Sequence, residues 1–133
     1  VERKTRFYIA IKMDDRSKDS MFLAISSLYN TLTSKLLKTF TVDRGKEFAC
    51  FEQVETEFGI PMYFADAYAA WQRGSNENSN GLLREFFPKK TDLAKVTLDK
   101  LTEALVLINN RPRKCLGFKT PFDMFKHEIK KLI

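Results

Sequence analysis

The sequence contains few of the residues that build metal clusters and disulfide scaffolds. Its 133 residues include two cysteines and one histidine. Cys50 and Cys115 belong to no CxxC pair, and a single histidine is too few for a zinc cluster. We therefore expect two free thiols in a reducing cytoplasm rather than a disulfide or a zinc site.

Other absences narrow the class of protein. No apolar run approaches the length of a membrane span, no signal-peptide pattern opens the chain, and no repeat or low-complexity tract interrupts it. In contrast, 44% of the residues are hydrophobic and twelve are phenylalanine, which is enough for a buried core. The sequence therefore predicts a single ordered domain over residues 1–133, in the cytoplasm and not in a membrane.

The charge balance favours an anionic partner. Lys and Arg outnumber Asp and Glu by 23 to 17, which gives a net charge of +6. Nucleic acid is the most common partner of a basic domain. Charge alone leaves the question open, because many basic domains bind no nucleic acid.

Hydrophobic spacing predicts strands that alternate with helices, the pattern of an α/β sandwich around a sheet. Strands are expected over residues 1–13, 38–43 and 60–64. Helices are expected over residues 19–37, 51–58 and 75–87, with further C-terminal helices from about 97, the last of which opens at Thr120-Pro121. Three strands are few for a stable sheet, so we expect that a first strand lies upstream of this chain.

Two carboxylates stand out by their positions in this pattern. Asp43 ends a predicted strand directly before Arg44-Gly45, and strand ends are where α/β sheets usually bind ligands. Glu77 lies near the start of a predicted helix, whose positive dipole favours an ionised carboxylate and a nearby phosphate. Two such carboxylates from different elements can bind Mg²⁺. A simpler interpretation stays open, since Asp is common in turns and Glu is common in first helical turns.

The surroundings of Glu77 are rich in hydrogen-bond donors. Asn is unfavourable in the interior of a helix, so several asparagines in one helix suggest that they have a functional role and do not stabilise the helix. Gly81, one turn beyond Glu77, leaves room for a backbone to approach. Amides and guanidinium groups donate to phosphates and base edges, so we expect DNA contacts from Arg73, Asn76, Asn80 and Arg84. Trp71, the only tryptophan in the sequence, is interpreted either as a buried residue that packs its loop against the core or as a DNA contact.

A basic loop follows the next predicted helix. Arg111, Arg113 and Lys114 surround Pro112, and they are placed either to contact phosphates or to complement the helix dipole. His127 is interpreted as a surface or core-edge residue, and Asp66 as a turn residue.

Three blocks of the sequence closely resemble one family. They are TVDRGKEF (41–48), YFADAYAAWQRGSNENSNGLLREFFPKKTDL (63–93) and INNRPRKCLGFKTPFDMF (108–125). Together they resemble transposases of the IS-thirty family of bacterial insertion sequences and, more distantly, the core of retroviral integrases. The resemblance implies a ribonuclease H-like α/β fold with a mixed sheet flanked by helices and lacking its first strand in this chain.

The resemblance also implies a catalytic Asp-Asp-Glu triad. Its second Asp matches Asp43 and its Glu matches Glu77, with 33 residues between them, which is the interval usual in the family. It implies Mg²⁺ or Mn²⁺ as cofactor, bound by Asp43 and Glu77, nicking of DNA at the element ends, and attack of the free 3′-hydroxyl on target DNA. Phosphate contacts are then expected from Lys46, Lys89, Lys90, Arg111, Arg113 and Lys114.

The chain departs from the family pattern in two ways. The first Asp of the triad belongs upstream of Val1, so the chain by itself is expected to be inactive or nearly so. Residues 67–70 read Ala-Tyr-Ala-Ala, where relatives often read Pro-Tyr-Ser-Pro.

An exposed sheet edge predicts a homo-oligomer. Two alternatives stay open: a non-catalytic DNA-binding or dimerisation remnant, and a nuclease or resolvase on the same fold.

Overall fold

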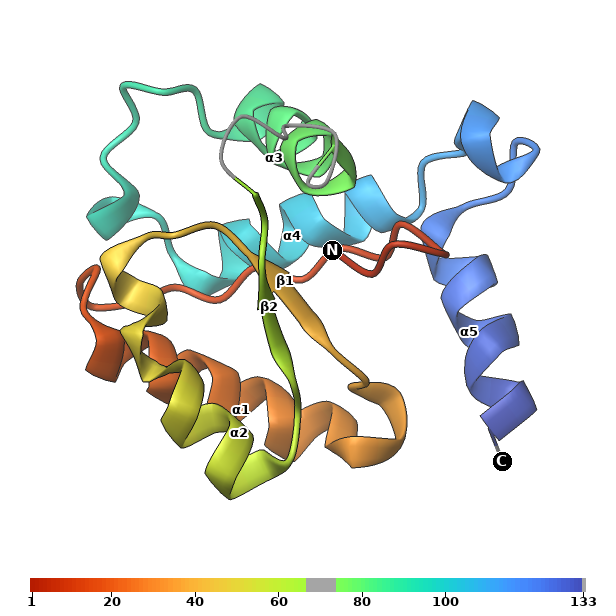
Figure 1. Cartoon of the computed structure of the whole chain (residues 1–133). Coiled ribbons are helices and arrows are strands. Elements are labelled where there is room, and N and C mark those ends of the chain that lie inside the picture. Colours follow the sequence, from red (N-terminus) through yellow and green to blue (C-terminus); the bar gives the residue numbers. More distant parts are fainter. Residues whose placement is uncertain (67–73, 133) are drawn as a thin grey trace. The chain divides into compact units, whose positions relative to one another are not determined.

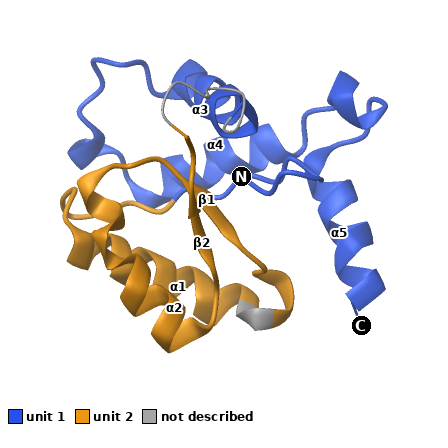
Figure 2. Ribbon diagram, in the orientation of Figure 1, with its two compact units in different colours: residues 1–10, 74–133 blue, residues 11–73 orange. Residues whose placement is uncertain are grey.

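The computed structural model describes residues 1–66 and 74–132, apart from the side chains of residues 33 and 34. The chain divides into two compact units, residues 11–73 (unit 2) and residues 1–10 with 74–133 (unit 1), which are coloured separately in Figure 2. In the described part of the chain, no helix has the length and apolar character that a bilayer crossing requires.

Unit 2 is built around a pair of parallel strands joined by a helical crossover (Figure 1). The strands pair in the register Phe40 to Met62, Thr41 to Tyr63 and Val42 to Phe64. Parallel strands need such a crossover because a tight turn cannot join them. Its elements in chain order are α1 (Lys18–Leu36), β1 (Phe40–Val42), the 3₁₀ helix η1 (Lys46–Cys50), α2 (Phe51–Phe58) and β2 (Met62–Phe64).

The core of unit 2 joins the two helices to the two strands. Five buried apolar side chains form its centre: Ile25, Val42, Cys50, Val54 and Met62. Phenylalanines surround them, and the ring of Phe58 lies 5.7 Å from that of Phe22 and 4.6 Å from that of Tyr29. Each fully buried apolar side chain stabilises the fold by about 1.5–3 kcal/mol, which is why the apolar stripes of α1 and α2 pack against the strands.

The ends of the unit 2 helices follow the local sequence signals. The Ser17 Oγ accepts a hydrogen bond from the Ser20 N–H at 3.1 Å, as an N-terminal cap of α1 does. Gly59 ends α2 in the left-handed conformation at φ 65°, and its N–H donates to the Glu55 carbonyl. The structure confirms the helices predicted over residues 19–37 and 51–58, to within two residues at each end. It also confirms the strands predicted over residues 38–43 and 60–64, although both are shorter than expected.

The described part of unit 1 consists of the N-terminal segment, three α-helices and two short 3₁₀ helices. Two of the α-helices begin with recognisable caps: the Thr97 hydroxyl accepts from the Lys100 N–H at 3.2 Å, and the Thr120 hydroxyl accepts from the Asp123 N–H at 3.1 Å. The predicted helices over 75–87, from about 97 and from 120 are therefore confirmed. The elements are α3 (Gly74–Phe86), η3 (Leu93–Lys95), α4 (Leu98–Asn109), η4 (Lys114–Leu116) and α5 (Pro121–Leu132).

The apolar residues of α5 are only partly buried. Phe125 of α5 stacks on Phe7, with ring centroids 4.3 Å apart and planes 6° from parallel. Phe122 and Leu132, however, are 43% and 47% exposed, because the N-terminal segment covers only part of the helix.

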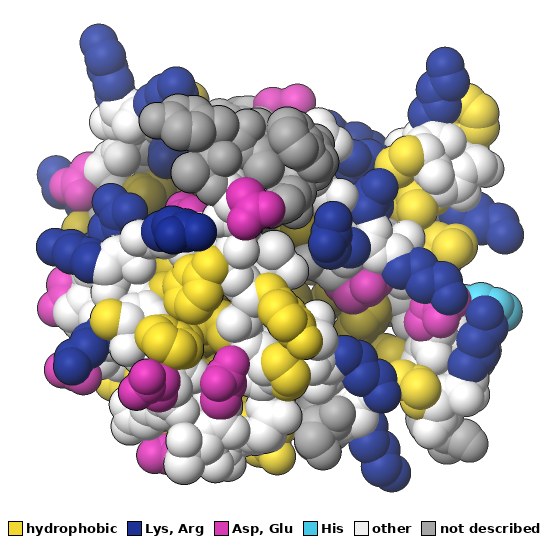
Figure 3. Space-filling view, in the orientation of Figure 1, with side chains coloured by type: hydrophobic (Ala, Val, Ile, Leu, Met, Phe, Trp, Pro, Cys, Tyr) yellow, Lys and Arg dark blue, Asp and Glu magenta, His cyan; other side chains and the backbone are white. Residues whose placement is uncertain are grey.

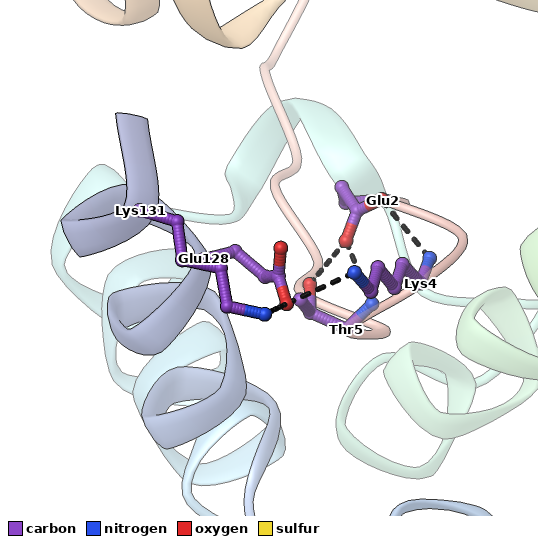
Figure 4. Close-up of polar contacts among 5 residues, drawn as sticks. All are labelled: Glu2, Lys4, Thr5, Glu128 and Lys131. Atoms are coloured by element: carbon purple, nitrogen blue, oxygen red, sulfur yellow. Dashed lines mark hydrogen bonds and ion pairs between the residues drawn. The ribbon is translucent and has the colours of Figure 1, made fainter. Parts of the chain in front are cut away.

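The expected strand over residues 1–13 is wrong. The segment begins with a tight turn, in which the N–H groups of Lys4 and Thr5 donate to the Glu2 carboxylate at 2.9 and 2.7 Å. Figure 4 shows this turn beside α5, where Glu128 pairs with both Lys4 and Lys131. Burial alone would raise the pKa of Glu2, but the hydrogen bonds from Thr5 and Lys4 hold it below its usual value.

A side chain replaces the missing strand partner of the N-terminal segment. The Asn109 Oδ1 accepts from the Tyr8 N–H at 2.9 Å, and the Asn109 Nδ2 donates to the Tyr8 carbonyl at 2.9 Å. One buried amide thus satisfies both backbone groups of Tyr8, as a paired strand residue would. The alternation of apolar and polar residues in this segment therefore reflects extended backbone that pairs with the Asn109 side chain and not with a neighbouring strand.

This pairing predicts that Asn109 is the most sensitive polar residue of unit 1. Asn109→Ala leaves a buried N–H and a buried carbonyl unsatisfied and should lower the free energy of unfolding by about 2–4 kcal/mol. The neighbouring Asn110→Ala is the matched control, because Asn110 is exposed, and it should cost about 0.5 kcal/mol. Urea denaturation measures both, and equal losses for the two variants would contradict the assigned role of Asn109.

Candidate functional site

Asp43 directly follows β1 and is held in a turn. Its Oδ1 accepts a hydrogen bond from the Gly45 N–H at 2.8 Å, and its side chain is half-buried. An Asp that bonds its own backbone two residues on fixes the direction of its carboxylate. The turn therefore holds a carboxylate at the carboxyl end of a parallel strand, where α/β sheets bind ligands.

A second carboxylate beneath this turn was missed by the sequence interpretation. Glu47 is only 7% exposed, and its Oε2 lies 3.1 Å from the Arg16 Nε. A Cβ atom at Gly45 would lie 2.5–2.7 Å from the Glu47 carboxyl group, so any larger residue at position 45 would have to push that carboxyl group aside. Because the backbone of Gly45 is extended (φ −63°, ψ 149°), it is space and not a left-handed conformation that favours glycine.

Glu77 lies in the first turn of α3 and is exposed. The free N–H groups at this end of the helix give it a partial positive charge, which favours an ionised carboxylate. Asn76 is half-buried, while Asn80 and Arg84 are exposed one and two turns beyond Glu77. α3 therefore presents the predicted acidic and donor groups along the same stretch of one helix, within unit 1.

Tyr8 holds one of these donors in a defined direction. Its hydroxyl donates to the Asn80 Oδ1 at 2.6 Å. Burial raises the pKa of Tyr8, with a smaller opposing effect of Arg84, so the hydroxyl stays protonated at neutral pH. Since the Asn80 carbonyl oxygen is occupied by Tyr8, the Nδ2 group of Asn80 is the part left to donate to a ligand. Tyr8 carried no functional signal in the sequence.

The predicted basic residues differ in how their charges are used. Arg111 pairs with Glu85 at 3.2 Å, so part of its charge is already neutralised inside unit 1. Arg113 is half-buried, and its Nη1 is buried with no hydrogen-bond partner among the described residues. Four lysines are exposed to solvent: Lys46 at the start of η1, Lys89 and Lys90 in the turn after α3, and Lys114 in η4.

Gly81 opens onto empty space in the described part of the chain. No described atom lies within 4 Å of the position that a Cβ would take there. The room expected at this position is therefore present, but no backbone among the described residues fills it.

Trp71 and Arg73 lie outside the described residues, as do residues 67–70. Asp43 belongs to unit 2 and Glu77 to unit 1, and each has been placed here within its own unit. Among the residues that the structure describes, no group of three or more His, Cys, Asp or Glu side chains gathers as a metal site would require.

Comparison with proteins of known identity shows which proteins the chain is similar to. No protein-family model matches the chain. The transposase InsI of insertion sequence element IS30A from Escherichia coli K12 is 40% identical over 129 residues, which span 97% of this chain. The transposase of insertion sequence element IS1086 from Cupriavidus metallidurans is 36% identical over 93% of this chain. The chain is homologous to the IS30-family transposases.

The IS30-family relationship covers only part of each relative. The chain spans 34% of the InsI transposase and 37% of the IS1086 transposase. The catalytic core domain of bovine immunodeficiency virus (BIV) integrase superposes over 100% of this chain and 87% of that domain, with a TM-score of 0.76 and 20% identity. The ribonuclease H-like, integrase-like fold expected from the sequence is therefore confirmed for this chain.

The two glycines near the candidate carboxylates should respond in opposite ways to alanine. Gly45→Ala forces the Glu47 carboxylate away from Arg16 and should lower the free energy of unfolding by about 1–3 kcal/mol. Gly81→Ala adds a methyl group in open space on a helix and should raise it by about 0.5–1 kcal/mol. Thermal denaturation of the two variants tests this, and a shift in the same direction for both would contradict the geometry described.

Proposed function

We propose that this chain is catalytic-core sequence of a DNA transposase that breaks DNA at the ends of an insertion element and joins the ends to target DNA. The observation that carries the proposal is the pair of carboxylates, Asp43 at the end of β1 and Glu77 at the start of α3, in a chain homologous to transposases. The integrase-like fold supports the same class of reaction.

The residues present fit a divalent metal ion. Asp43 and Glu77 offer carboxylate oxygens, the hard ligands that Mg²⁺ and Mn²⁺ prefer, and one or two carboxylates with substrate phosphates are enough to bind Mg²⁺ in phosphoryl-transfer enzymes. Such an ion would stabilise the charge that develops on the transferring phosphate. We propose that Asp43 and Glu77 hold it, with Mg²⁺ or Mn²⁺ as the ion.

The other residues of the chain would position DNA. The Nδ2 group of Asn80, directed by Tyr8, and the guanidinium of Arg84 donate to phosphate oxygens beside Glu77. The exposed Lys46, Lys89, Lys90 and Lys114 add non-specific affinity that falls as salt rises. Arg111 contributes less than these lysines, because Glu85 already pairs with it.

Self-association belongs to the same proposal. Within the described residues, the sheet of unit 2 consists of β1 and β2 alone, and Tyr63 on β2 is 58% exposed. A short sheet with open edges can pair with a second copy of the chain. Sedimentation of a monomer at all concentrations would remove this part of the proposal and leave the catalytic part intact.

Substitution of the two carboxylates tests the catalytic proposal. In the parent protein that contains this chain, Asp43→Asn and Glu77→Gln should each reduce both DNA nicking and strand joining by at least about 10³-fold, because each removes a charged metal ligand. Asp14→Asn and Glu103→Gln, at exposed positions, are the matched controls and should retain activity within about twofold.

The substrates separate the possible outcomes. Pre-cut element ends measure joining alone, whereas intact ends measure nicking first. Loss of nicking with joining retained would indicate a different role for the two carboxylates. Full activity of both carboxylate variants on both substrates would refute the catalytic proposal.

A further inference from the structure

Residues 113–119, between α4 and α5, form a closed turn that we call the aromatic turn. The Arg113 N–H donates to the Lys119 carbonyl at 3.0 Å, and the Phe118 N–H donates to the Arg113 carbonyl at 2.8 Å. A further hydrogen bond, from the Lys119 N–H to the Leu116 carbonyl, spans the tip at 3.3 Å. Backbone hydrogen bonds therefore fix the direction in which the tip residue Phe118 projects.

Phe118 adopts a backbone conformation that phenylalanine rarely takes. Gly117 has φ 63° and Phe118 has φ 65°, so two consecutive residues at the tip lie in the left-handed region. Turns that need two such residues normally contain Gly, Asn or Asp, because a side chain with a Cβ is strained there. The Phe118 side chain gains little from burial in return, since it is 70% exposed. Both the strained backbone and the exposed apolar ring of Phe118 lower the stability of the fold, which points to a role in binding.

The sequence on both sides of Phe118 carries positive charge only. From Ala104 to Phe122 the sequence has four basic residues and no acidic one. Of the basic residues in the aromatic turn, Lys114 and Lys119 are exposed, and the Arg113 Nη1 has no hydrogen-bond partner among the described residues. In Figure 3, the corner at the upper right, over the connection between α4 and α5, shows Lys and Arg side chains next to hydrophobic ones. An exposed aromatic ring among unbalanced cations matches the chemistry of a nucleic acid rather than that of an apolar protein surface.

We propose that Phe118 stacks on an unpaired DNA base while Lys114 and Lys119 contact the adjoining phosphates. This inference rests on the proposed function, which makes DNA the partner. The base is unpaired because the faces of paired bases are covered by their neighbours in the duplex, whereas strand ends and overhangs expose them. Stacking on an aromatic ring does not depend on which base is stacked, so the aromatic turn recognises a frayed or single-stranded DNA end and not its base sequence.

Fluorescence anisotropy with two labelled DNAs tests the inference on the chain of residues 1–133. One probe is a blunt duplex, and the other is the same duplex with a short single-stranded overhang. The unsubstituted chain should bind the overhang DNA about 5- to 100-fold more tightly than the blunt DNA, as one stacked base allows. Phe118→Ala should remove this preference and leave affinity for the blunt duplex and the salt slope unchanged.

Two further variants separate stacking from charge and from folding. Lys114→Gln should lower the salt slope by about one on both DNAs while the overhang preference persists. Phe118→Asn suits the left-handed backbone, so it should melt at the same temperature as the unsubstituted chain or higher, yet lose the preference. Phe118→Trp should keep the preference.

The outcomes assign failure to one proposal or the other. Equal binding of both DNAs by the unsubstituted chain, or a preference that survives Phe118→Asn, overturns the stacking role and leaves the proposed function standing. Absence of binding to either DNA at low salt removes DNA as the partner, and with it both the stacking role and the DNA contacts of the proposed function.

Discussion

The pairing of one side-chain amide with one backbone residue is the interaction on which unit 1 depends. Asn109, at the end of α4, satisfies both the N–H and the carbonyl of Tyr8, 101 residues earlier in the chain. The first ten residues have no strand partner among the described residues, so without this amide the two backbone groups of the buried Tyr8 would lose their partner, which costs more than a hydrogen bond normally contributes. The contact of Phe7 with α5 and the ion pair of Lys4 with Glu128 depend on the same anchored segment.

The anchored segment in turn orders the helix that carries the candidate site. Tyr8 reaches from the anchored backbone to Asn80, three residues beyond Glu77 on α3. Unit 2 holds the end of β1 differently: the Asp43 carboxylate accepts a hydrogen bond from the Gly45 N–H in its own turn, and the buried Glu47 carboxylate pairs with the largely exposed Arg16. Asp43 is thus held by its own turn, whereas Glu77 lies on a helix that Tyr8 contacts at Asn80, and both carboxylates are placed where the local backbone favours a ligand. Phe118 is a contrasting case, in which the fold carries strain and exposed apolar area at a position that no packing explains.

Local signals in the sequence were sufficient to predict the helices and the two paired strands. The boundaries of α2, for example, follow from its apolar stripe and from Gly59, both of which can be read from the local sequence. Asp43 and Glu77 could be placed on their elements for the same reason, although their catalytic roles stay predictions. Contacts between distant residues could not be predicted. Alternation over residues 1–13 indicated extended backbone but not that an asparagine would replace a neighbouring strand. Nothing in the sequence around Glu47 showed that this carboxylate would be buried and would pair with Arg16, 31 residues earlier. Likewise, the exposure of Phe122 and Leu132 depends on how much of α5 the N-terminal segment covers, which the sequence of α5 alone does not show.

Asp43 and Glu77 are proposed to serve one divalent cation, and paramagnetic broadening by Mn²⁺ measures this most directly. In nuclear magnetic resonance spectra of the isotope-labelled chain, Mn²⁺ broadens the signals of nuclei near its binding site even when it binds weakly. A shared cation predicts that the amide signals of Asp43 to Gly45 and of Glu77 broaden together at the same Mn²⁺ concentration, and that Mg²⁺ restores both. Broadening confined to one of the two segments, or absent from both while other acidic residues respond, would contradict the claim.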